Sequence, residues 1–190
     1  MSLRILQFGA TGQLAREVLG RANSDIEVKA LSRADVDLTD AAAVARAIDA
    51  ETDVDLVLNA AAYTAVDKAE AEPELAYLVN GRAPGAIARA CAARDLPLVH
   101  ISTDMVFSGA KDGAYVETDP VGPLHIYGAS KLAGEEAVLA AHDRAMVLRV
   151  SWLFSAYGSN FIHLMLRLAQ TQAALKVVRD QRARPTGSGD

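Results

Sequence analysis

The stretch Arg4–Ala15, with the sequence Arg-Ile-Leu-Gln-Phe-Gly-Ala-Thr-Gly-Gln-Leu-Ala, decides the fold of this chain. Its apolar first part, Arg4–Phe8, predicts a short buried strand, and Gln13–Arg21 predicts a helix. Between them, Gly9 permits a tight turn and Gly12 lets the backbone approach a pyrophosphate at the helix N-terminus. This strand, glycine turn and helix predict a dinucleotide-binding unit, with a plain structural turn as the alternative.

Strands and helices alternate along the rest of the chain. Further strands are predicted at Glu27–Leu31, Val54–Leu58, Leu98–Ser102, Met146–Val150 and Leu175–Arg179. Further helices are predicted at Asp40–Ala50, Pro73–Ala93, Tyr127–Ala141 and Asn160–Ala169. Asp40 is the expected N-cap of its helix, and Pro84 predicts a break or restart of the helix near Gly81–Gly85 because proline lacks an N–H. The alternation predicts an α/β fold, a doubly wound parallel sheet of the Rossmann type, with residues 1–190 forming the cofactor-binding domain.

Composition excludes several classes of protein. The 190 residues carry a net charge of −5 and the basic residues are dispersed, which argues against nucleic acid and anionic membranes as partners. Cys91 is the only cysteine, so we expect a buried thiol and neither a disulfide nor a cysteine-rich metal site. The four histidines show no ligand spacing, His100 is expected in the core, and no metal is expected. Without a signal peptide or a membrane-length apolar run, we expect a soluble cytoplasmic protein.

Four segments with candidate ligand-binding residues directly follow predicted strands. They are the glycine turn, the segment Asn59–Thr64, the triplet Ser102-Thr103-Asp104, and the pair Ser151-Trp152. Since ligands of such folds bind at the carboxyl ends of the strands, we expect all four to line one edge of the sheet.

The end of the second strand bears on cofactor choice. A protein selective for NAD usually carries an acidic residue there, about 20 residues past the glycines, to bind the ribose 2′-OH. This chain has Ser32 and Arg33 instead, and arginine attracts a 2′-phosphate. We therefore expect NADPH, with NADH tolerated, although a solvated surface arginine is the alternative. Asp37 and Leu38 are expected to flank the adenine.

Tyr127 and Lys131 are four residues apart at the start of a predicted helix, so both side chains can point into one pocket. A neighbouring cation lowers the pKa of a phenol, which would allow Tyr127 to exchange a proton near neutral pH. The Thr103 hydroxyl can donate a hydrogen bond to a substrate carbonyl. Asp104 would either orient a sugar hydroxyl or cap a loop. A solvated helix face is the alternative for the Tyr-Lys pair, and Glu135-Glu136 are expected to be surface charges.

Several segments together resemble a known family. They are Gly9–Leu14, Asn59–Glu70, Ser102–Phe107, Tyr127–Glu135, Arg149–Phe154 and the run from Asp180 to Thr186. In these residues the chain resembles dTDP-4-dehydrorhamnose reductases, which are extended short-chain dehydrogenases/reductases. The resemblance implies reduction of dTDP-4-dehydrorhamnose to dTDP-L-rhamnose with NADPH or NADH, and a dTDP-sugar as the small-molecule partner. The oligomeric state is left undecided, and a homodimer is one option.

The resemblance also implies roles for individual residues. The catalytic set is Thr103, Tyr127 and Lys131, and the substrate contacts are Thr103, Asp104 and Trp152. The residues expected to contact the cofactor are Gly9, Thr11, Gly12, Gln13, Leu14, Ser32, Arg33, Asp37, Leu38, Ala61, Ala62, Tyr63, Thr64, Ala65, Tyr127 and Lys131. Within this set, Gly12, Gln13 and Leu14 would hold the pyrophosphate.

Two departures from the family pattern stand out. Met105 occupies a place where the family often has an aromatic residue, and the chain ends at Asp190, so we expect the smaller C-terminal substrate domain to be truncated. Two other functions stay open. One is a related sugar-nucleotide epimerase or dehydratase, although Met105-Val106 lacks the second acid typical of a dehydratase. The other is a non-catalytic subunit like the regulatory subunit of methionine adenosyltransferase, which resembles the same family.

Overall fold

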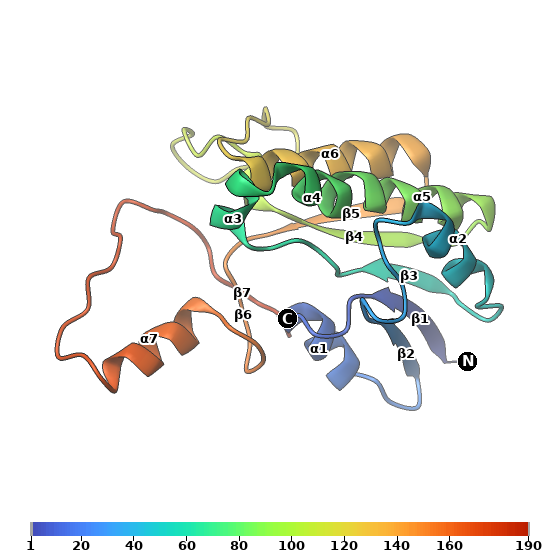
Figure 1. Ribbon diagram of the computed structural model, residues 1–190, viewed down its shortest axis with the longest axis horizontal. Coiled ribbons are helices and arrows are strands. Elements are labelled where there is room, and N and C mark those ends of the chain that lie inside the picture. Colours follow the sequence, from blue (N-terminus) through green and yellow to red (C-terminus); the bar gives the residue numbers. More distant parts are fainter. Residues whose placement is uncertain (1, 190) are drawn as a thin grey trace.

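A five-stranded parallel sheet forms the centre of the computed structural model, which describes residues 2–189 (Figure 1). The strands are β1 (Leu3–Phe8), β2 (Ile26–Leu31), β3 (Leu56–Asn59), β4 (Leu98–Thr103) and β5 (Ala145–Val150). Their order in the sheet is β2-β1-β3-β4-β5. The chain changes direction across the sheet between β1 and β3, which is where such folds bind ligands. The predicted doubly wound, Rossmann-like sheet is confirmed.

Helices cover both faces of this sheet unequally. The helices are α1 (Gln13–Gly20), α2 (Ala41–Asp49), α3 (Val66–Ala71), α4 (Pro73–Tyr77), α5 (Ala83–Ala93), α6 (Ile126–Ala141) and α7 (Phe161–Ala169). In Figure 1, α2, α4, α5 and α6 lie on one face and α1 lies on the other. The core between the sheet and the larger layer includes Leu6, Phe8, Val44, Ile48, Val57, Ile87 and Leu98, and the lone thiol of Cys91 is buried there as expected.

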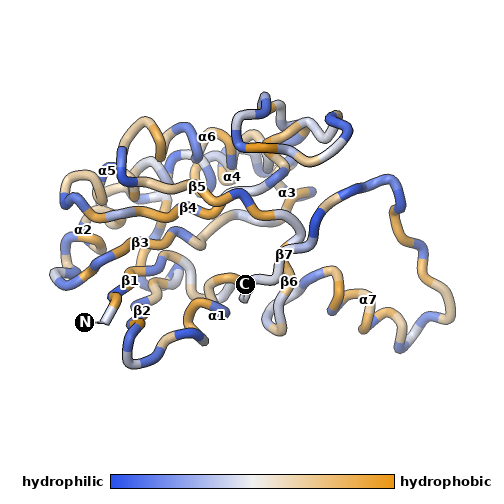
Figure 2. The backbone as a smooth tube through the Cα atoms, turned by 180° about the vertical axis from the view of Figure 1, so that it is seen from behind, coloured by the Kyte–Doolittle hydropathy of each residue, from blue (hydrophilic) through white to orange (hydrophobic). Residues whose placement is uncertain are grey.

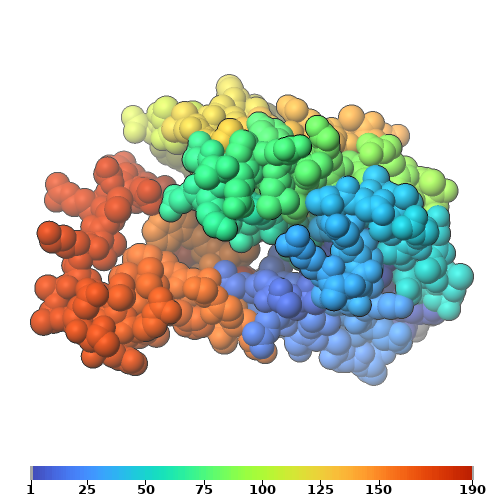
Figure 3. Space-filling view, viewed as in Figure 1, coloured from blue at the N-terminus to red at the C-terminus, as the bar shows by residue number. Residues whose placement is uncertain are grey.

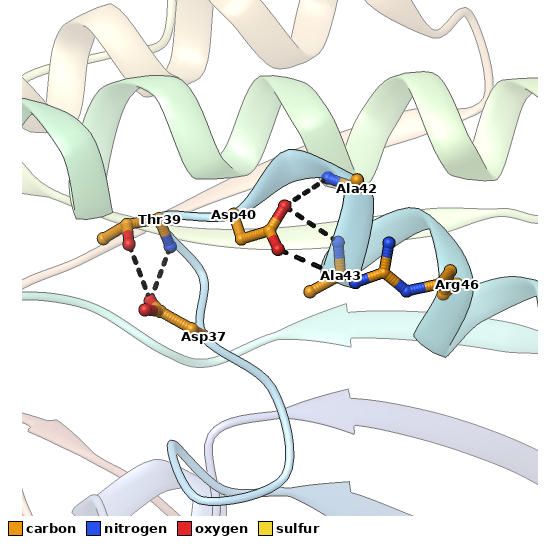
Figure 4. A network of polar contacts seen from close by, with 6 residues as sticks. All are labelled: Asp37, Thr39, Asp40, Ala42, Ala43 and Arg46. Atoms are coloured by element: carbon orange, nitrogen blue, oxygen red, sulfur yellow. Dashed lines mark hydrogen bonds and ion pairs between the residues drawn. The ribbon is translucent and has the colours of Figure 1, made fainter.

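The turn that leads from β2 into α2 is fixed by short-range polar contacts (Figure 4). Asp40 accepts hydrogen bonds from the backbone N–H groups of Ala42, at 2.8 Å, and Ala43, at 3.1 Å. This confirms Asp40 as the N-cap, a contact that typically stabilises a helix by about 1 kcal/mol. Asp37 accepts in the same way from the N–H and the hydroxyl of Thr39. The turn therefore holds its shape through contacts between near neighbours.

The helical segment Pro73–Ala93 breaks and restarts where Pro84 led us to expect it. A π-helical turn, Leu78–Arg82, joins α4 to α5, and α5 begins at Ala83, within the expected range Gly81–Gly85. Pro84 has no N–H to donate to the carbonyl of Asn80, so the α-helical pattern cannot continue there. That carbonyl lies against Gly134 of α6, so close that a Cβ on Gly134 could not fit. The irregular turn thus brings Asn80 into contact with the helix that carries Tyr127.

The C-terminal part of the chain differs most from the sequence-based expectation. Leu175–Arg179, predicted as a strand, pairs with no strand, and Val177 and Val178 are 53% and 64% exposed. Leucine and valine favour a strand here only where a neighbouring strand supplies hydrogen-bond partners. The two short strands that do form here, β6 (Leu153–Phe154) and β7 (Thr186–Gly187), were not predicted. In Figures 1 and 2, α7 stands away from the sheet with an apolar side, and none of its residues is buried.

None of the helices within residues 2–189 combines the length and the apolar character that crossing a bilayer requires. The short helix α3 was also not predicted. Its Glu70 accepts a hydrogen bond from the N–H of Ile126, at 2.8 Å, where α6 begins. The first turn of α6 is further capped by His125, whose Nδ1 accepts from the N–H of Gly128. Both contacts anchor the start of the helix that carries Tyr127 and Lys131.

Candidate functional site

A cleft of about 380 Å³ opens at the carboxyl ends of β1, β2 and β3. Figure 3 shows it as a hollow between the glycine turn and the segment that follows β3. The predicted cofactor residues that line it are Gly9, Thr11, Gly12, Ser32, Arg33, Asp37, Leu38, Ala61, Ala62, Tyr63 and Thr64. The predicted residues outside its lining are Gln13, Leu14, Ala65, Tyr127 and Lys131. Most of the predicted cofactor set therefore converges on one cleft.

Sequence reasoning missed part of the lining. The additional residues are Phe8, Ala10, Leu31, Val36, Thr39, Ala60, Leu75 and Val79. Leu75 and Val79 are four apart, on one side of the helical segment that runs from α4 into the π-helical turn, and this spacing is a signal that could have placed them together. The others directly precede, follow or separate residues that were predicted.

The two glycines of the turn serve different purposes. Gly9 has a φ of +99°, and a Cβ there would lie 3.0 Å from the backbone nitrogen of Ala61. Gly9 is thus required by the fold itself, both for its left-handed conformation and for the close approach of β1 to β3. Gly12 has a φ of −69°, which any residue adopts, and a Cβ there would meet nothing within 4 Å. Gly12 therefore leaves an open space above the N-terminus of α1.

Gly12→Ala is expected to change the unfolding free energy by no more than about 1 kcal/mol, because the added methyl group fits the folded chain and restricts the unfolded one, which offsets the poorer N-cap that alanine makes at the start of α1. The same methyl group would occupy the space where a pyrophosphate approaches the helix N-terminus, so dinucleotide affinity is expected to fall at least about tenfold. Urea unfolding and cofactor titration measure the two effects. Gly9→Ala serves as the contrast and is expected to destabilise the fold. Unchanged cofactor affinity in Gly12→Ala would contradict this role for Gly12.

The turn after β2 places an acidic side chain at the strand end, which the sequence spacing did not suggest. Ser32 and Arg33 line the cleft as expected. Asp35, three residues on, folds back so that one carboxylate oxygen accepts from the N–H of Ser32, at 2.8 Å, and from its hydroxyl, at 2.6 Å. An acidic group thus stands at the end of the second strand, where the sequence was expected to offer only Ser32 and Arg33.

Buried Asn80 ties the cleft to α6, the helix that carries Tyr127. Its side chain accepts from the N–H of Tyr63, at 2.8 Å, and donates to the carbonyl of Tyr63, at 3.0 Å. It also donates to the hydroxyl of Ser130 on α6, at 3.1 Å. The phenol of Tyr63 donates to Glu72, at 2.6 Å. The segment after β3 is therefore held from both sides, and Asn80 is a positioning residue that sequence reasoning did not identify.

Thr103 and Tyr127 come together beyond the end of β4. Burial raises the pKa of Tyr127, the nearby Thr103 hydroxyl opposes this shift, and the Asp104 carboxylate adds to it. This direction is the reverse of the one expected from sequence. The pKa of an isolated phenol is about 10, so Tyr127 is protonated at neutral pH. A protonated phenol is suited to donating a proton.

Lys131 is almost fully buried, with 2% of its surface exposed. Its Nζ donates to the carbonyl of Ile101 in β4, at 2.6 Å. Burial lowers the pKa of Lys131 to about 8, and the Glu135 carboxylate opposes that shift. Nearby His100 is fully buried as expected, and burial together with the Lys131 charge lowers its pKa to about 3.

Glu135 is not the surface charge that the sequence led us to expect. It is 2% exposed and forms a two-pronged ion pair with Arg149 of β5, with contacts of 2.6 and 2.9 Å. Buried carboxylates are found almost only in such pairs. The guanidinium of Arg149 also lies over the ring of Phe107, which stacks on Tyr115. Glu136, by contrast, is exposed as expected. Glu135 thus links α6 to β5 and to the loop after β4.

Asp104 and Trp152 follow β4 and β5 at the same edge of the sheet. Asp104 accepts from the hydroxyl of Ser151, at 2.6 Å, and from the hydroxyl of Thr103, at 3.2 Å. Trp152 is 41% exposed with a φ of +44°, and its ring packs on Phe161 of α7. The edge expected from the sequence is therefore present in the fold. Among residues 2–189, no group of three or more His, Cys, Asp or Glu side chains is arranged to hold a metal ion.

Comparison with known proteins gives one consistent set of relatives. Residues 3–190 match the protein family described as RmlD substrate binding domain. The chain is 45% identical over 189 residues to a dTDP-4-dehydrorhamnose reductase of Sinorhizobium fredii, and 46% identical over 193 residues to one of Mycolicibacterium smegmatis. These alignments include 99% and 100% of this chain, but only 63% and 58% of the relatives. The chain therefore spans about three fifths of their length.

A solved structure shares both the fold and the family likeness. It is the dTDP-4-dehydrorhamnose reductase of Bacillus anthracis in complex with NADP, with a TM-score of 0.95 and 35% sequence identity. The superposition covers 99% of this chain and 67% of the other.

Proposed function

We propose, since the chain belongs to the RmlD substrate binding domain family, that it binds NADPH or NADH in the cleft and provides the catalytic groups for reducing dTDP-4-dehydrorhamnose to dTDP-L-rhamnose. The observation that carries this proposal is the meeting of Thr103 and a protonated Tyr127 at the same sheet edge as the glycine-lined cleft. Homologous reductases support the reaction class. The identity of the sugar nucleotide rests on the family likeness alone.

The residues of the cleft fit a dinucleotide. The open space over Gly12 faces the first turn of α1, whose N–H groups at Gln13, Leu14 and Ala15 donate to no acceptor within residues 2–189. Free N–H groups and the positive end of a helix dipole bind anions such as a pyrophosphate. Ser32 and Arg33 would lie beside the adenosine ribose, and Tyr63, Thr64 and Ala65 along the remainder of the cofactor. The solved relative that binds NADP supports this assignment.

The chemistry divides among three side chains. The bound nicotinamide supplies a hydride to the carbonyl carbon of the sugar. The Thr103 hydroxyl donates a hydrogen bond to the carbonyl oxygen and stabilises the negative charge that develops on it. Tyr127 transfers its phenolic proton to that oxygen, which completes the alcohol. Lys131, freed from Ile101, would hydrogen-bond the nicotinamide ribose. Its ammonium would then stabilise the phenolate that the proton transfer leaves behind.

Two residues are proposed to position the substrate. Asp104, whose carboxylate already accepts from Ser151 and Thr103, would orient a sugar hydroxyl. The exposed ring of Trp152 would contact the sugar nucleotide. We also propose that the remaining substrate contacts are made by a smaller substrate domain, as is expected for the relatives.

Cofactor binding is expected to favour NADPH over NADH or to be equal for both, because Arg33 offers a cation to a 2′-phosphate. Fluorescence titration of the chain with each cofactor measures the preference. Arg33→Ala is expected to weaken the binding of NADPH about tenfold, as for a lost charge-assisted hydrogen bond. The affinity for NADH should stay nearly unchanged. Arg46→Ala, which removes an exposed arginine of α2 outside the cleft, is the control. A marked preference for NADH that survives in Arg33→Ala would contradict this role for Arg33.

Reduction itself is best tested in a chimera in which the remaining part of the Sinorhizobium fredii relative follows residue 190. Loss of NADPH absorbance on adding dTDP-4-dehydrorhamnose would support the proposed function. Tight cofactor binding without turnover would contradict it and favour a non-catalytic subunit.

A further inference from the structure

In the turn after β2, two hydrogen-bond donors of Ser32 are both bonded to Asp35. The N–H and the hydroxyl of Ser32 both donate to the same oxygen of Asp35, at 2.8 and 2.6 Å. The Ser32 oxygen in turn accepts from the N–H of Ala34, at 3.2 Å. Ser32 lines the cleft, whereas Asp35 does not. Asp35 therefore bears on the cleft through Ser32.

Arg33, between these two residues, is in the opposite situation. It is exposed, lines the cleft, and forms no hydrogen bond or ion pair with the rest of residues 2–189. Its charge acts at longer range on Asp37, whose pKa is lowered mainly by hydrogen bonds from Thr39 and to a smaller extent by Arg33. The guanidinium is thus available to an anion in the cleft.

The two cofactors differ only in what they bring to this corner of the cleft. In folds of this type the 2′ position of the adenosine ribose lies at the end of the second strand. A phosphate monoester there carries a charge of about −1.5 to −2 at neutral pH and needs hydrogen-bond donors. The hydrogen bonds from Ser32 lower the pKa of Asp35, so its carboxylate is charged at neutral pH. The Asp35 carboxylate would therefore repel a charged 2′-phosphate, whereas it would not repel an uncharged 2′-hydroxyl.

We propose that Asp35 is a specificity-determining residue of the cofactor site and acts through its charge, which the two donors of Ser32 hold beside the cleft. Its carboxylate holds both Ser32 donors and repels a 2′-phosphate, so it reduces the preference for NADPH that Arg33 creates. This inference rests on the proposed function, because it assumes that the cleft binds a nicotinamide dinucleotide.

A purely local role for Asp35 makes a different prediction. A serine followed three residues later by an acid, with reciprocal hydrogen bonds, is the capping-box arrangement and stabilises a turn by itself. If Asp35 did only this, its loss would loosen the turn and weaken both cofactors alike. The ratio of the two affinities separates the two roles, since a structural defect does not distinguish a phosphate from a hydroxyl.

The test uses the 190-residue chain and titrates NADPH and NADH into the wild type and Asp35→Asn. Asparagine keeps the size of the side chain and can still accept from Ser32, but it carries no charge. We expect NADPH to bind about three- to tenfold more tightly, as for removal of one like charge near the protein surface, and NADH to change less than about twofold. Asp49→Asn, which removes the same charge from the exposed end of α2, should change neither affinity.

A double-mutant cycle locates the effect. Because the Ser32 hydroxyl helps to hold the Asp35 carboxylate beside the cleft, the gain in NADPH affinity from Asp35→Asn should shrink in a Ser32→Ala background. An unchanged NADPH-to-NADH ratio in Asp35→Asn, or equal weakening of both cofactors, would overturn this inference and leave the proposed function intact. Failure of the wild type to bind either cofactor would overturn both.

Discussion

Tyr127→Phe is expected to lower kcat by about 10²–10⁴-fold while leaving cofactor affinity within about twofold of the wild type. The substitution removes only the phenolic proton, and general acid catalysis typically contributes that factor. The ring stays in place beside Thr103, so the cleft should keep its shape. The measurement is steady-state turnover of the keto sugar in the chimera with the Sinorhizobium fredii relative, with cofactor titration alongside.

Tyr157→Phe is the matched control for this experiment. Tyr157 loses the same hydroxyl, and its ring lies beneath the guanidinium of Arg16 on α1, on the opposite side of the sheet from α6. Turnover in this variant should stay close to that of the wild type. If Tyr127→Phe kept most of its rate, another group would have to supply the proton, and the role proposed for Tyr127 would be lost.

The second large effect concerns Lys131 and pH. Its pKa is about 8 in the folded chain, against 10.5 for an unperturbed lysine, chiefly because of burial. Between these values the unfolded chain binds more protons than the folded one, so the free energy of unfolding rises with pH. The cost of burying the ammonium is fully present below pH 8 and is removed as pH rises toward 10.5. The difference amounts to at most about 3 kcal/mol.

Urea unfolding of the wild type and Lys131→Met at several pH values between 7 and 10.5 measures this contribution. The wild type should gain stability relative to the variant across that range. Other titrating groups cancel in the comparison because both proteins share them. Lys176→Met, which removes an exposed ammonium, is the control and should follow the wild type. If the curves of wild type and Lys131→Met ran parallel, the ammonium would not be buried as the structure has it.

The elements that the sequence predicted well are those whose signals are local. The glycine turn after a short apolar strand, and Asp40 two residues before the N–H groups it caps, need no distant partner to be recognised. The position of Thr103 and Asp104 at the same edge as the glycine turn was also predictable, because the strands of a parallel sheet have their carboxyl ends at one edge. The prediction of a strand at Leu175–Arg179 was wrong because a strand depends on a neighbour, which no local pattern provides.

The features that the sequence did not reveal depend on contacts between distant segments. Glu135 looked like a solvated helix residue, and only its pairing with Arg149 fourteen residues away explains its burial. The raised pKa of Tyr127 follows from its burial and from the nearby Asp104 carboxylate, and sequence spacing encodes neither. The reversal of Asp35 onto Ser32 is local, but the same three-residue spacing occurs in ordinary turns, so it carried no functional signal until the cleft was seen.

The three contacts of Asn80 have a consequence for motion. They join the segment at Tyr63 to α6 at Ser130, so the floor of the cleft and the catalytic helix should move as one rigid body. The opposite wall, residues 32–39, is different, because its side-chain hydrogen bonds connect residues no more than three apart. In hydrogen exchange, the amide of Tyr63 should be protected for far longer than the amides of Ser32 and Thr39.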